Sequence, residues 1–218
     1  MAVREIITIG HPTLRHKARK VTKFGPEVKQ LIDDMIETMR QAPGVGLAAP
    51  QVNVSERIVV VEVPADEEEG TPAELYAYVN PEIVKTSREI EDGEEGCLSI
   101  PGYVGEVDRH IWIVVRGQDA YGKPQRIRAN DYLARIFQHE IDHLEGVLFI
   151  DHVADPEKIR KVTAKDADAH NPEVTEALAL LTKRAHGIVV VVDERRRDHG
   201  RHHPIRLQST FQFDRPPD

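Results

Sequence analysis

The chain has 218 residues, which at roughly 150 residues per domain amounts to one domain or at most two. Hydrophobic residues make up 40% of it and charged residues 30%, a composition typical of globular domains and unlike that of disordered chains. With 29 Lys and Arg against 37 Asp and Glu, the formal net charge is −8. This acidic balance argues against a general nucleic-acid binder, which needs clustered basic residues.

Cysteine content and the length of apolar runs indicate the compartment. The lone Cys97 excludes an internal disulfide framework and is typical of proteins in reducing surroundings. Arg4 and Glu5 interrupt the first residues, so no secretory signal is predicted there. No stretch approaches the roughly 18 consecutive apolar residues of a membrane span. We therefore expect a cytoplasmic protein that does not bind membranes.

The first predicted helix covers Pro26–Gln41. A glycine precedes it in a turn, and proline suits the first helical position. Apolar residues then recur at the spacing of one buried helical face, at Val28, Leu31, Ile32, Met35 and Met39. Pro43 and Gly44 end the helix, since neither residue favours helical backbone.

Apolar runs rich in β-branched residues predict strands at 57–63, 75–79, 83–86, 111–117 and 124–128. The first run is expected to be buried, and the acidic, turn-rich segment 64–72 after it is expected to be a surface loop. Asn80 and Pro81 separate the second strand from the third. The turn at 120–122 joins the last two strands into a hairpin.

A second helix is predicted from Asn130 or Asp131, either of which could cap it, to Gly146. One side of this helix carries an apolar stripe of four residues: Leu133, Phe137, Ile141 and Leu144. Beside the stripe lie Ile136 and three ionisable residues, His139, Glu140 and His143, which form a cluster at the edge of the core. The residues that face the other way are Arg135, Gln138 and Asp142. Half of this helix is therefore expected to be core.

The composition changes after about residue 165. A short helix is predicted over 171–181, and the sequence beyond 193 lacks apolar periodicity. We therefore divide the chain into a domain at 1–165 and a C-terminal extension at 166–218, which holds the short helix and then a poorly ordered tail.

The strongest chemical signal is the pattern His-Glu-Ile-Asp-His at 139–143. Histidines four positions apart lie one turn apart on the same helical face, where His139 and His143 can both reach one metal ion. Glu140 points toward the same site and can move protons there. The alternative is a surface helix with two solvated histidines, and the apolar stripe beside the pair argues against it.

A catalytic metal usually takes three protein ligands, so a third is needed. In the metzincin pattern it would be a histidine at the position of Phe149. The other candidates are Cys97, His152 and Glu157. A thiolate binds borderline divalent metals strongly, although a lone cysteine is more often a small buried apolar residue. The spacing leaves this choice open.

The glycine-rich segment GVGLAAPQ at 44–51 is a weak signal on its own. It lacks the Lys and Ser/Thr of a phosphate-binding loop and the third glycine of a dinucleotide fingerprint. Its small residues would let a substrate backbone approach closely, and Gln51 could then donate a hydrogen bond. An ordinary tight turn is the alternative.

The segments GVGLAAPQ, EGCLSIPG and QHEIDHLEG, in this order, resemble the three signature motifs of the peptide deformylase family. The resemblance extends over 1–165 and includes the start at 7–15. It implies a hydrolase that removes the N-formyl group from the initiator methionine of newly synthesised polypeptides and releases formate. Its partners would be N-formyl-methionyl nascent peptides, without specific recognition of nucleic acid.

The resemblance also implies roles for individual residues. The metal ligands would be Cys97, His139 and His143, and Glu140 would be the general acid and base. The donors to the developing oxyanion would be the Gln51 amide and the Leu98 backbone N–H, while Gly46 would bind the substrate backbone. Glu95 and Arg109 would form a supporting ion pair.

Methionine specificity requires an apolar pocket, for which Val45 and Ile136 are the candidate walls. The alternative is that both residues belong to the ordinary apolar core.

A site of one Cys and two His permits zinc or ferrous iron. The resemblance implies Fe²⁺, with Zn²⁺, Ni²⁺ or Co²⁺ able to replace it. The extension is expected to be a solvated tail, or alternatively to contact the ribosome transiently.

Two other function classes remain at this stage. A metallopeptidase would use His152 or Glu157 as third ligand, and a non-catalytic metal-binding relative would be expected to lack Glu140 or Gln51, which this chain keeps. For the fold we expect the α+β class, with small antiparallel sheets wrapped around a central metal-binding helix and Pro26–Gln41 packed outside.

Overall fold

The structure is a computed structural model, and it describes residues 2–42, 44–65, 70, 72–153 and 155–162. The chain divides into two compact units. Of the described residues, those within Met1–Glu91 and Arg109–Leu148 form the larger unit, and those within Asp92–Asp108 and from Phe149 to 162 belong to the smaller. The short helix predicted at 171–181 and the tail predicted beyond 193 lie outside the described residues.

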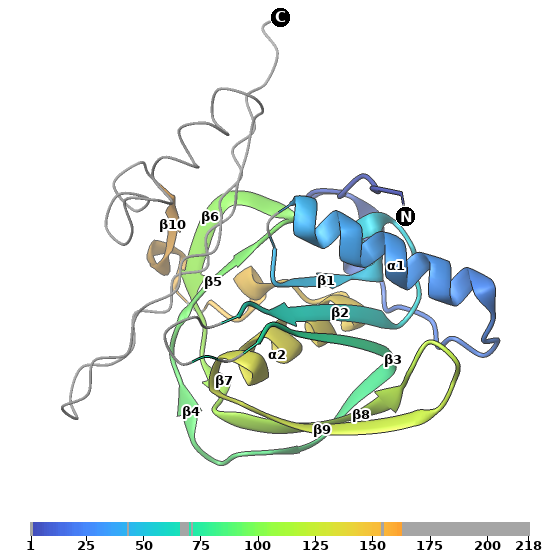
Figure 1. Cartoon of the computed structure of the whole chain (residues 1–218). Helices are drawn as coiled ribbons and strands as arrows, with labels where there is room; N and C mark the ends of the chain where they lie inside the picture. Colours follow the sequence, from blue (N-terminus) through green and yellow to red (C-terminus); the bar gives the residue numbers. More distant parts are fainter. Residues whose placement is uncertain (1, 43, 66–69, 71, 154, 163–218) are drawn as a thin grey trace, which may run out of the picture. The chain divides into compact units, whose positions relative to one another are not determined.

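A five-stranded antiparallel sheet forms the framework of the larger unit (Figure 1), in the strand order β1-β2-β3-β8-β9. Its strands are β1 (Gly46–Ala48), β2 (Ile58–Val63), β3 (Glu74–Thr86), β8 (Trp112–Gln118) and β9 (Pro124–Asn130). A two-stranded ribbon pairs β4 (Ile90–Glu91) with β7 (Arg109–His110). The predicted hairpin is confirmed, since β8 and β9 pair along their whole length.

Two helices, α1 (Pro26–Gln41) and α2 (Asp131–Glu145), lie on either side of β1 and β2 (Figure 1). In β2, Val59 and Val61 pack in the core cluster that includes α2. Ile58 and Val60, on the other face of the strand, are equally buried, and α1 contacts this strand. Burial on both faces explains why the strand is a continuous apolar run instead of an alternating one. The predicted face of α1 is confirmed as its buried side.

The largest apolar cluster lies between α2 and the sheet. Phe137, at the centre of α2, is fully buried and packs edge-on against two tyrosines of β3. Its ring centroid lies 6.0 Å from that of Tyr76 and 5.4 Å from that of Tyr78. Such edge-to-face pairs add to the stabilisation from area burial, by about 0.5–1.5 kcal/mol each. These contacts fix the rotation of α2 about its own axis.

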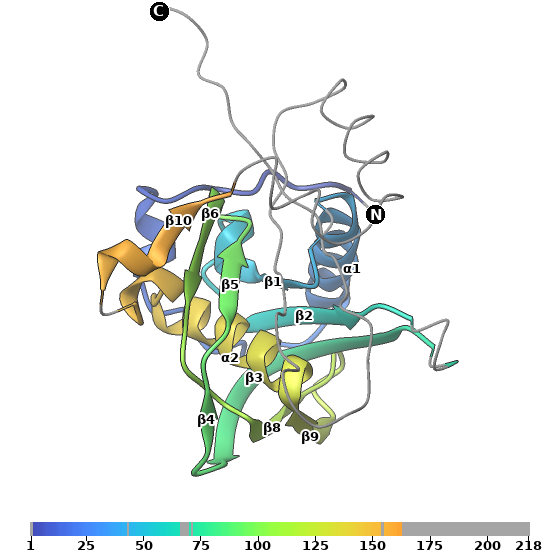
Figure 2. The same cartoon turned by 90° about the vertical axis from the view of Figure 1, so that its left-hand side faces the viewer.

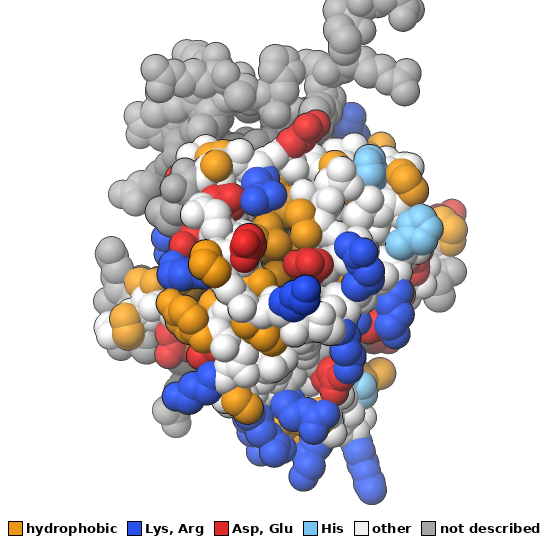
Figure 3. Space-filling view, turned by 90° about the vertical axis from the view of Figure 1, so that its right-hand side faces the viewer, with side chains coloured by type: hydrophobic (Ala, Val, Ile, Leu, Met, Phe, Trp, Pro, Cys, Tyr) orange, Lys and Arg blue, Asp and Glu red, His pale blue; other side chains and the backbone are white. Residues whose placement is uncertain are grey.

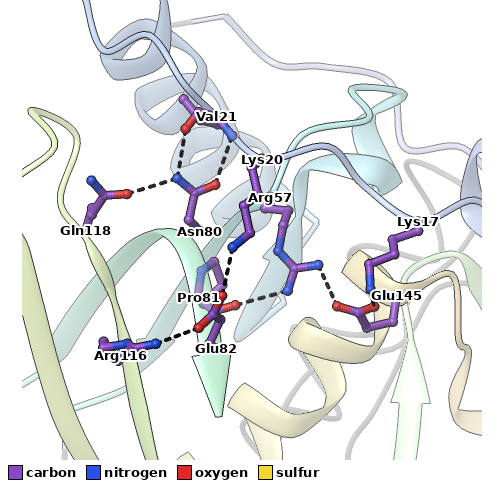
Figure 4. Close-up of polar contacts among 10 residues, drawn as sticks. All are labelled: Lys17, Lys20, Val21, Arg57, Asn80, Pro81, Glu82, Arg116, Gln118 and Glu145. Atoms are coloured by element: carbon purple, nitrogen blue, oxygen red, sulfur yellow. Dashed lines mark hydrogen bonds and ion pairs between the residues drawn. The ribbon is translucent and has the colours of Figure 1, made fainter. Parts of the chain in front are cut away.

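The prediction of two strands at 75–79 and 83–86 is wrong, because β3 is one strand with an irregularity in the middle. Asn80 has a positive φ of 52°, and the pairing with β8 shifts register between Val79 and Glu82. Pro81 has no N–H to donate to a strand ladder and is accommodated at this bulge. The Asn80 side chain exchanges two hydrogen bonds with the backbone of Val21 (Figure 4).

The expectation that half of α2 is core underestimates its burial. Its buried residues run without interruption from Ala134 to Ile141, which encloses every side of the helix over two turns. Arg135 donates to the backbone oxygen of Glu91, and Gln138 both donates to and accepts from the backbone of His110. These polar residues face the β4–β7 ribbon, where backbone groups satisfy them.

The two ends of α2 differ in how well they were predicted. Asn130 occupies the N-cap position, but its side chain makes no capping hydrogen bond; its Oδ1 instead accepts from Nε of Arg128. At the other end Gly146 takes the left-handed conformation, with φ 77°, as predicted for a helix C-terminus. A Cβ there would lie 2.8 Å from the backbone of Arg15, so the position also requires glycine for space.

The smaller unit contains a three-stranded antiparallel sheet in the order β10-β6-β5 (Figure 2). Its elements are β5 (Glu94–Cys97), β6 (Ile100–Glu106), η3 (Phe149–Asp151), η4 (Pro156–Lys158) and β10 (Ile159–Lys161). Two helices with small antiparallel sheets confirm the predicted α+β class. No helix within the described residues is both long enough and apolar enough to cross a membrane.

Candidate metal centre

Two imidazoles on α2 form the first part of the site. His139 and His143 are one turn apart, their ring centroids lie 5.0 Å from one another, and both side chains are buried. The helix continues for only two residues beyond His143. Both rings therefore lie inside the protein, on a part of the helix whose neighbouring residues are buried.

The third member is a thiol at the end of β5. Cys97 is buried and precedes a tight turn that leads into β6, where it pairs with Ile100 after a shift of register. Cys97, His139 and His143 form a group that could hold a metal ion, since one ligand atom from each lies within 4.8 Å of the others. One thiolate and two imidazoles suit a borderline divalent ion.

The other candidates for third ligand do not join this group. Within 2–162, leaving out the few undescribed positions, it is the single set of three or more such side chains close enough to share an ion. Phe149 is buried and apolar, whereas His152 and Glu157 are exposed. The donor set of the metallopeptidase alternative is therefore not assembled in the described residues.

The Glu140 side chain packs against β1 at Gly46, which has no side chain of its own. Only 4% of its surface is exposed, and its carboxylate abuts Gly46 in β1. A Cβ added to Gly46 would lie 2.2 Å from Oε1 of Glu140 and 2.7 Å from its Cδ. No real contact is so short, so any other residue at this position would displace the carboxylate. Gly46 and Glu140 are thus sterically coupled.

The orientation of the Gln51 amide is set by its own loop. Gln51 is fully buried in the short 3-10 helix η2 (Ala49–Val52), and its Oε1 accepts a hydrogen bond of 2.8 Å from the backbone N–H of Ala48. An N–H can only donate, so this bond distinguishes the oxygen from the nitrogen. The amide nitrogen is consequently the end that serves as a donor elsewhere. Leu98 lies in the turn between β5 and β6, where it is half-buried.

Val45 and Ile136 both contact the apolar core. Ile136 is buried in the cluster between α2 and the sheet, and Val45 packs against the same cluster while remaining partly exposed. The structure therefore brings these two predicted side chains into one apolar group. For Glu95 and Arg109, the predicted pairing stays a prediction.

Polar residues without a recognisable sequence signal hold α2 in place. Arg57, buried at the start of β2, donates to Oε1 of Glu145 at 2.5 Å and to the backbone oxygen of Pro81 at 3.1 Å (Figure 4). Burial raises the pKa of Glu145, but ion pairs with Lys17 and Arg57 outweigh this effect, and the pKa lies below its usual range.

A second ion pair holds the same turn, where Nη1 of Arg109 lies 2.6 Å from Oδ2 of Asp142. The partners in these two pairs are 88 and 33 positions apart in the sequence. No local pattern could have indicated them.

Comparison with known proteins agrees with this geometry. The family model described as polypeptide deformylase matches residues 3–159. A peptide deformylase of Thermomicrobium roseum is 47% identical over 170 residues, which cover 77% of this chain and 96% of that protein. One of Halothermothrix orenii is 52% identical over 153 residues, covering 70% and 95%.

Solved structures give the same picture. The crystal structure of the peptide deformylase from Thermotoga maritima has a TM-score of 0.66 at 42% identity, covering 71% of this chain and all of that one. The structure of a Synechococcus elongatus peptide deformylase in complex with actinonin has a TM-score of 0.66 at 37% identity, covering 71% and 81%.

Proposed function

The chain belongs to the peptide deformylase family, and we propose which of its residues perform the family's reaction. It is a hydrolase that removes the N-formyl group from the initiator methionine of newly synthesised polypeptides and releases formate. The family is metal-dependent, which agrees with the cluster of donors between Cys97 and the two histidines.

We propose that Cys97, His139 and His143 hold the ion. The donors fit one, because three buried groups of the right chemistry each place a ligand atom within 4.8 Å of the others. When bound, the ion lowers the pKa of water and polarises the formyl oxygen. We propose Fe²⁺ as the native ion, with Zn²⁺, Ni²⁺ or Co²⁺ able to replace it, since one sulfur and two nitrogens suit all four.

Glu140 is proposed as the general base and acid. Its carboxylate would accept the proton of the attacking water and then deliver it to the departing amine, which is a poor leaving group until it is protonated. The role requires the carboxylate to stay in one position during both transfers. The absence of a side chain at Gly46 supports that role, because it leaves the space that the Glu140 carboxylate occupies.

Gln51 and Leu98 are proposed as the donors to the developing oxyanion. The amide nitrogen of Gln51 and the backbone N–H of Leu98 would stabilise charge on the former carbonyl oxygen, an effect of typically about 3–4 kcal/mol per donor. The bond from Ala48 to the Gln51 oxygen supports this assignment, because it fixes the amide before substrate arrives.

Substrate binding is assigned to three further residues. Gly46 would pair its backbone with the peptide, while Val45 and Ile136 would form the apolar wall for the methionine side chain. We further propose that residues 1–165 form the catalytic domain and 166–218 an extension. Because its substrates are nascent chains, we place the enzyme in the cytoplasm, in transient contact with the ribosome.

The observation that carries these assignments is the closeness of one thiol and two imidazoles. The test is formate release from formyl-Met-Ala-Ser, measured beside cleavage of an unblocked peptide, for wild type and Cys97→Ala. We expect formate release that disappears without the thiol and no cleavage of the unblocked peptide by either protein. Peptide cleavage that survives in Cys97→Ala would instead support the metallopeptidase class.

A further inference from the structure

The outer face of the main sheet carries an unusual concentration of arginine. Strand pairing places side chains in rows across β3, β8 and β9, because directly paired residues share a face. One row is Lys85, Val114 and Arg128, and the next is Glu82, Arg116 and Arg126. The neighbouring residues Ile113 and Val115 point the opposite way, into the core cluster. We call the exposed set Lys85, Arg116, Arg126 and Arg128 the arginine face.

The charge of the arginine face is only partly neutralised. Glu82 pairs with Arg116 at 2.8 Å and with Lys20 at 3.0 Å, so one carboxylate serves two cations (Figure 4). Hydrogen bonds from Arg116 and Lys20 hold the pKa of Glu82 below its usual range, so it is charged at neutral pH. Among the described residues, Lys85, Arg126 and Arg128 have no acidic partner.

One arginine of the arginine face packs against an aromatic ring. The guanidinium of Arg128 stacks on the ring of Trp112, with its Cζ 4.3 Å from the ring centroid. Val114, which lies between Lys85 and Arg128, is only 7% exposed although it belongs to the outer face, as expected if long basic side chains cover it. An arginine that is already held against a ring loses less conformational entropy when it binds a partner.

Protection of a sheet edge does not account for this pattern. Charged residues on an edge strand discourage pairing with other chains, and β9, which carries Arg126 and Arg128, is an edge strand. Arg116, however, lies on β8, where it pairs with Glu82 of β3 on one side and with Arg126 of β9 on the other. The cations thus extend beyond the edge strand. In Figure 3, Lys and Arg side chains gather in the lower part of the view.

We propose that the arginine face binds the phosphate backbone of RNA without reading its sequence. The chain as a whole has a net charge of −8, so a local surface that holds the four cations of the arginine face and Lys20 with one carboxylate, Glu82, is not a consequence of composition. Arginine side chains bind phosphate through two parallel N–H groups, and contacts of this kind position a protein without specifying sequence. This inference concerns a surface that contains none of the residues assigned to catalysis.

The experiment measures binding of a fluorescein-labelled RNA hairpin by anisotropy, using the full-length protein. Arg126→Glu with Arg128→Glu should weaken binding at least tenfold. Lys29→Glu with Lys158→Glu, two exposed lysines outside the arginine face, changes the net charge by the same amount and should alter binding less than twofold. With about four phosphate contacts, log K should fall with log salt at a slope of about −3.

Several outcomes would overturn the proposal. Equal losses in both double variants would mean that net charge alone governs binding. Unchanged RNA binding by the arginine-face variant, accompanied by self-association, would mean that these residues protect the edge. Stronger binding to vesicles of anionic lipid than to RNA would identify a different partner. If the glutamate variant fails to fold, Arg126→Gln with Arg128→Gln gives the same comparison with a smaller expected loss.

Formate release from a short formyl peptide should be unchanged in both double variants. The two proposals are therefore tested independently. If the protein does not bind RNA, the proposed catalytic roles are unaffected, and the result of the Cys97→Ala activity assay does not bear on RNA binding.

Discussion

The two helices of the larger unit are almost equal in length, with 16 residues in α1 and 15 in α2, and both contact β1 and β2. α1 buries one face and leaves the other in water, whereas α2 is enclosed on every side. The buried polar residues of α1 are few: Asp34 and Thr38, which the N-terminal segment satisfies. α2 contains Arg135, Gln138, His139, Glu140 and His143 among its buried residues. One helix is organised for packing and the other for chemistry.

The comparison teaches that buried polarity, more than amphipathicity, marks the functional helix. It also predicts that substitutions in α1 change the free energy of unfolding while leaving turnover intact. Substitutions around the charged groups of α2 should do the reverse.

Glu140→Ala should produce the largest effect. Loss of a general acid and base lowers kcat by about two to four orders of magnitude, while metal content and the midpoint of urea unfolding should stay near wild type. Formate release, metal analysis and urea unfolding measure the three quantities. Near-normal kcat in this variant would show that Glu140 does not transfer the proton.

Met35→Ala on α1 tests the opposite side of the contrast. Met35 is fully buried, and its truncation should lower the free energy of unfolding by about 2–5 kcal/mol. The kcat of the folded fraction should not change. Glu27→Ala, at an exposed position of the same helix, is the matched control and should shift stability by no more than about 0.5 kcal/mol. A loss of kcat in Met35→Ala without unfolding would contradict the division between the helices.

Gly46→Ala tests the steric coupling between β1 and Glu140. The added Cβ should displace the carboxylate and lower kcat by about 10- to 100-fold, since misplacement by about 1 Å can cost that much. In the double variant Gly46→Ala with Glu140→Asp, the shorter carboxylate leaves room for the added Cβ. The kcat of this double variant should therefore be higher than that of Gly46→Ala alone.

The coupling between the two positions is the difference between two effects on kcat: that of Gly46→Ala in the wild type and that of Gly46→Ala in the Glu140→Asp variant. Additive losses would show that the two residues act independently, and the steric argument for Glu140 would then be wrong.

Asp34→Asn should give the smallest effect, and it depends on pH. The pKa of Asp34 lies below its usual range, chiefly because the backbone N–H of Ala2 donates to it, with further hydrogen bonds from Gln30 and Arg4. A carboxylate whose pKa is lower in the folded than in the unfolded state stabilises the fold at pH values above the unfolded-state pKa, about 3.9. This contribution to the free energy of unfolding is lost as the pH falls through the folded-state pKa.

Urea unfolding of wild type and Asp34→Asn should therefore differ at pH 7 and converge toward pH 3. If the free energies of unfolding of wild type and Asp34→Asn differed by the same amount from pH 7 to pH 3, the Asp34 carboxylate would not stabilise the fold through its charge.

Local patterns predicted the parts of the fold that depend on local chemistry. Proline and apolar periodicity gave α1 at its observed bounds, and the valine-rich run gave β2 to within one residue. The bulge in β3 was missed because Asn80 is held in its conformation by Val21 and Gln118, which are 59 and 38 positions away. The enclosure of α2 was missed for the same reason, since the groups that satisfy Arg135 and Gln138 come from the β4–β7 ribbon.

The candidate site was predicted from motifs, and spacing alone was not sufficient. His139 and His143 follow from helical geometry, but Cys97 is 42 positions earlier and competed with His152 and Glu157 as third ligand. The closeness of the three groups depends on tertiary structure, which no local pattern encodes. The requirement for glycine at Gly46 was also invisible, because it depends on where Glu140 lies.

The most direct test of the account is X-ray absorption spectroscopy of the full-length protein loaded with Zn²⁺. One sulfur at about 2.3 Å and two nitrogens at about 2.0–2.1 Å are expected, with the sulfur absent in Cys97→Ser. A wild-type spectrum that contains nitrogen ligands but no sulfur would contradict the proposed metal centre.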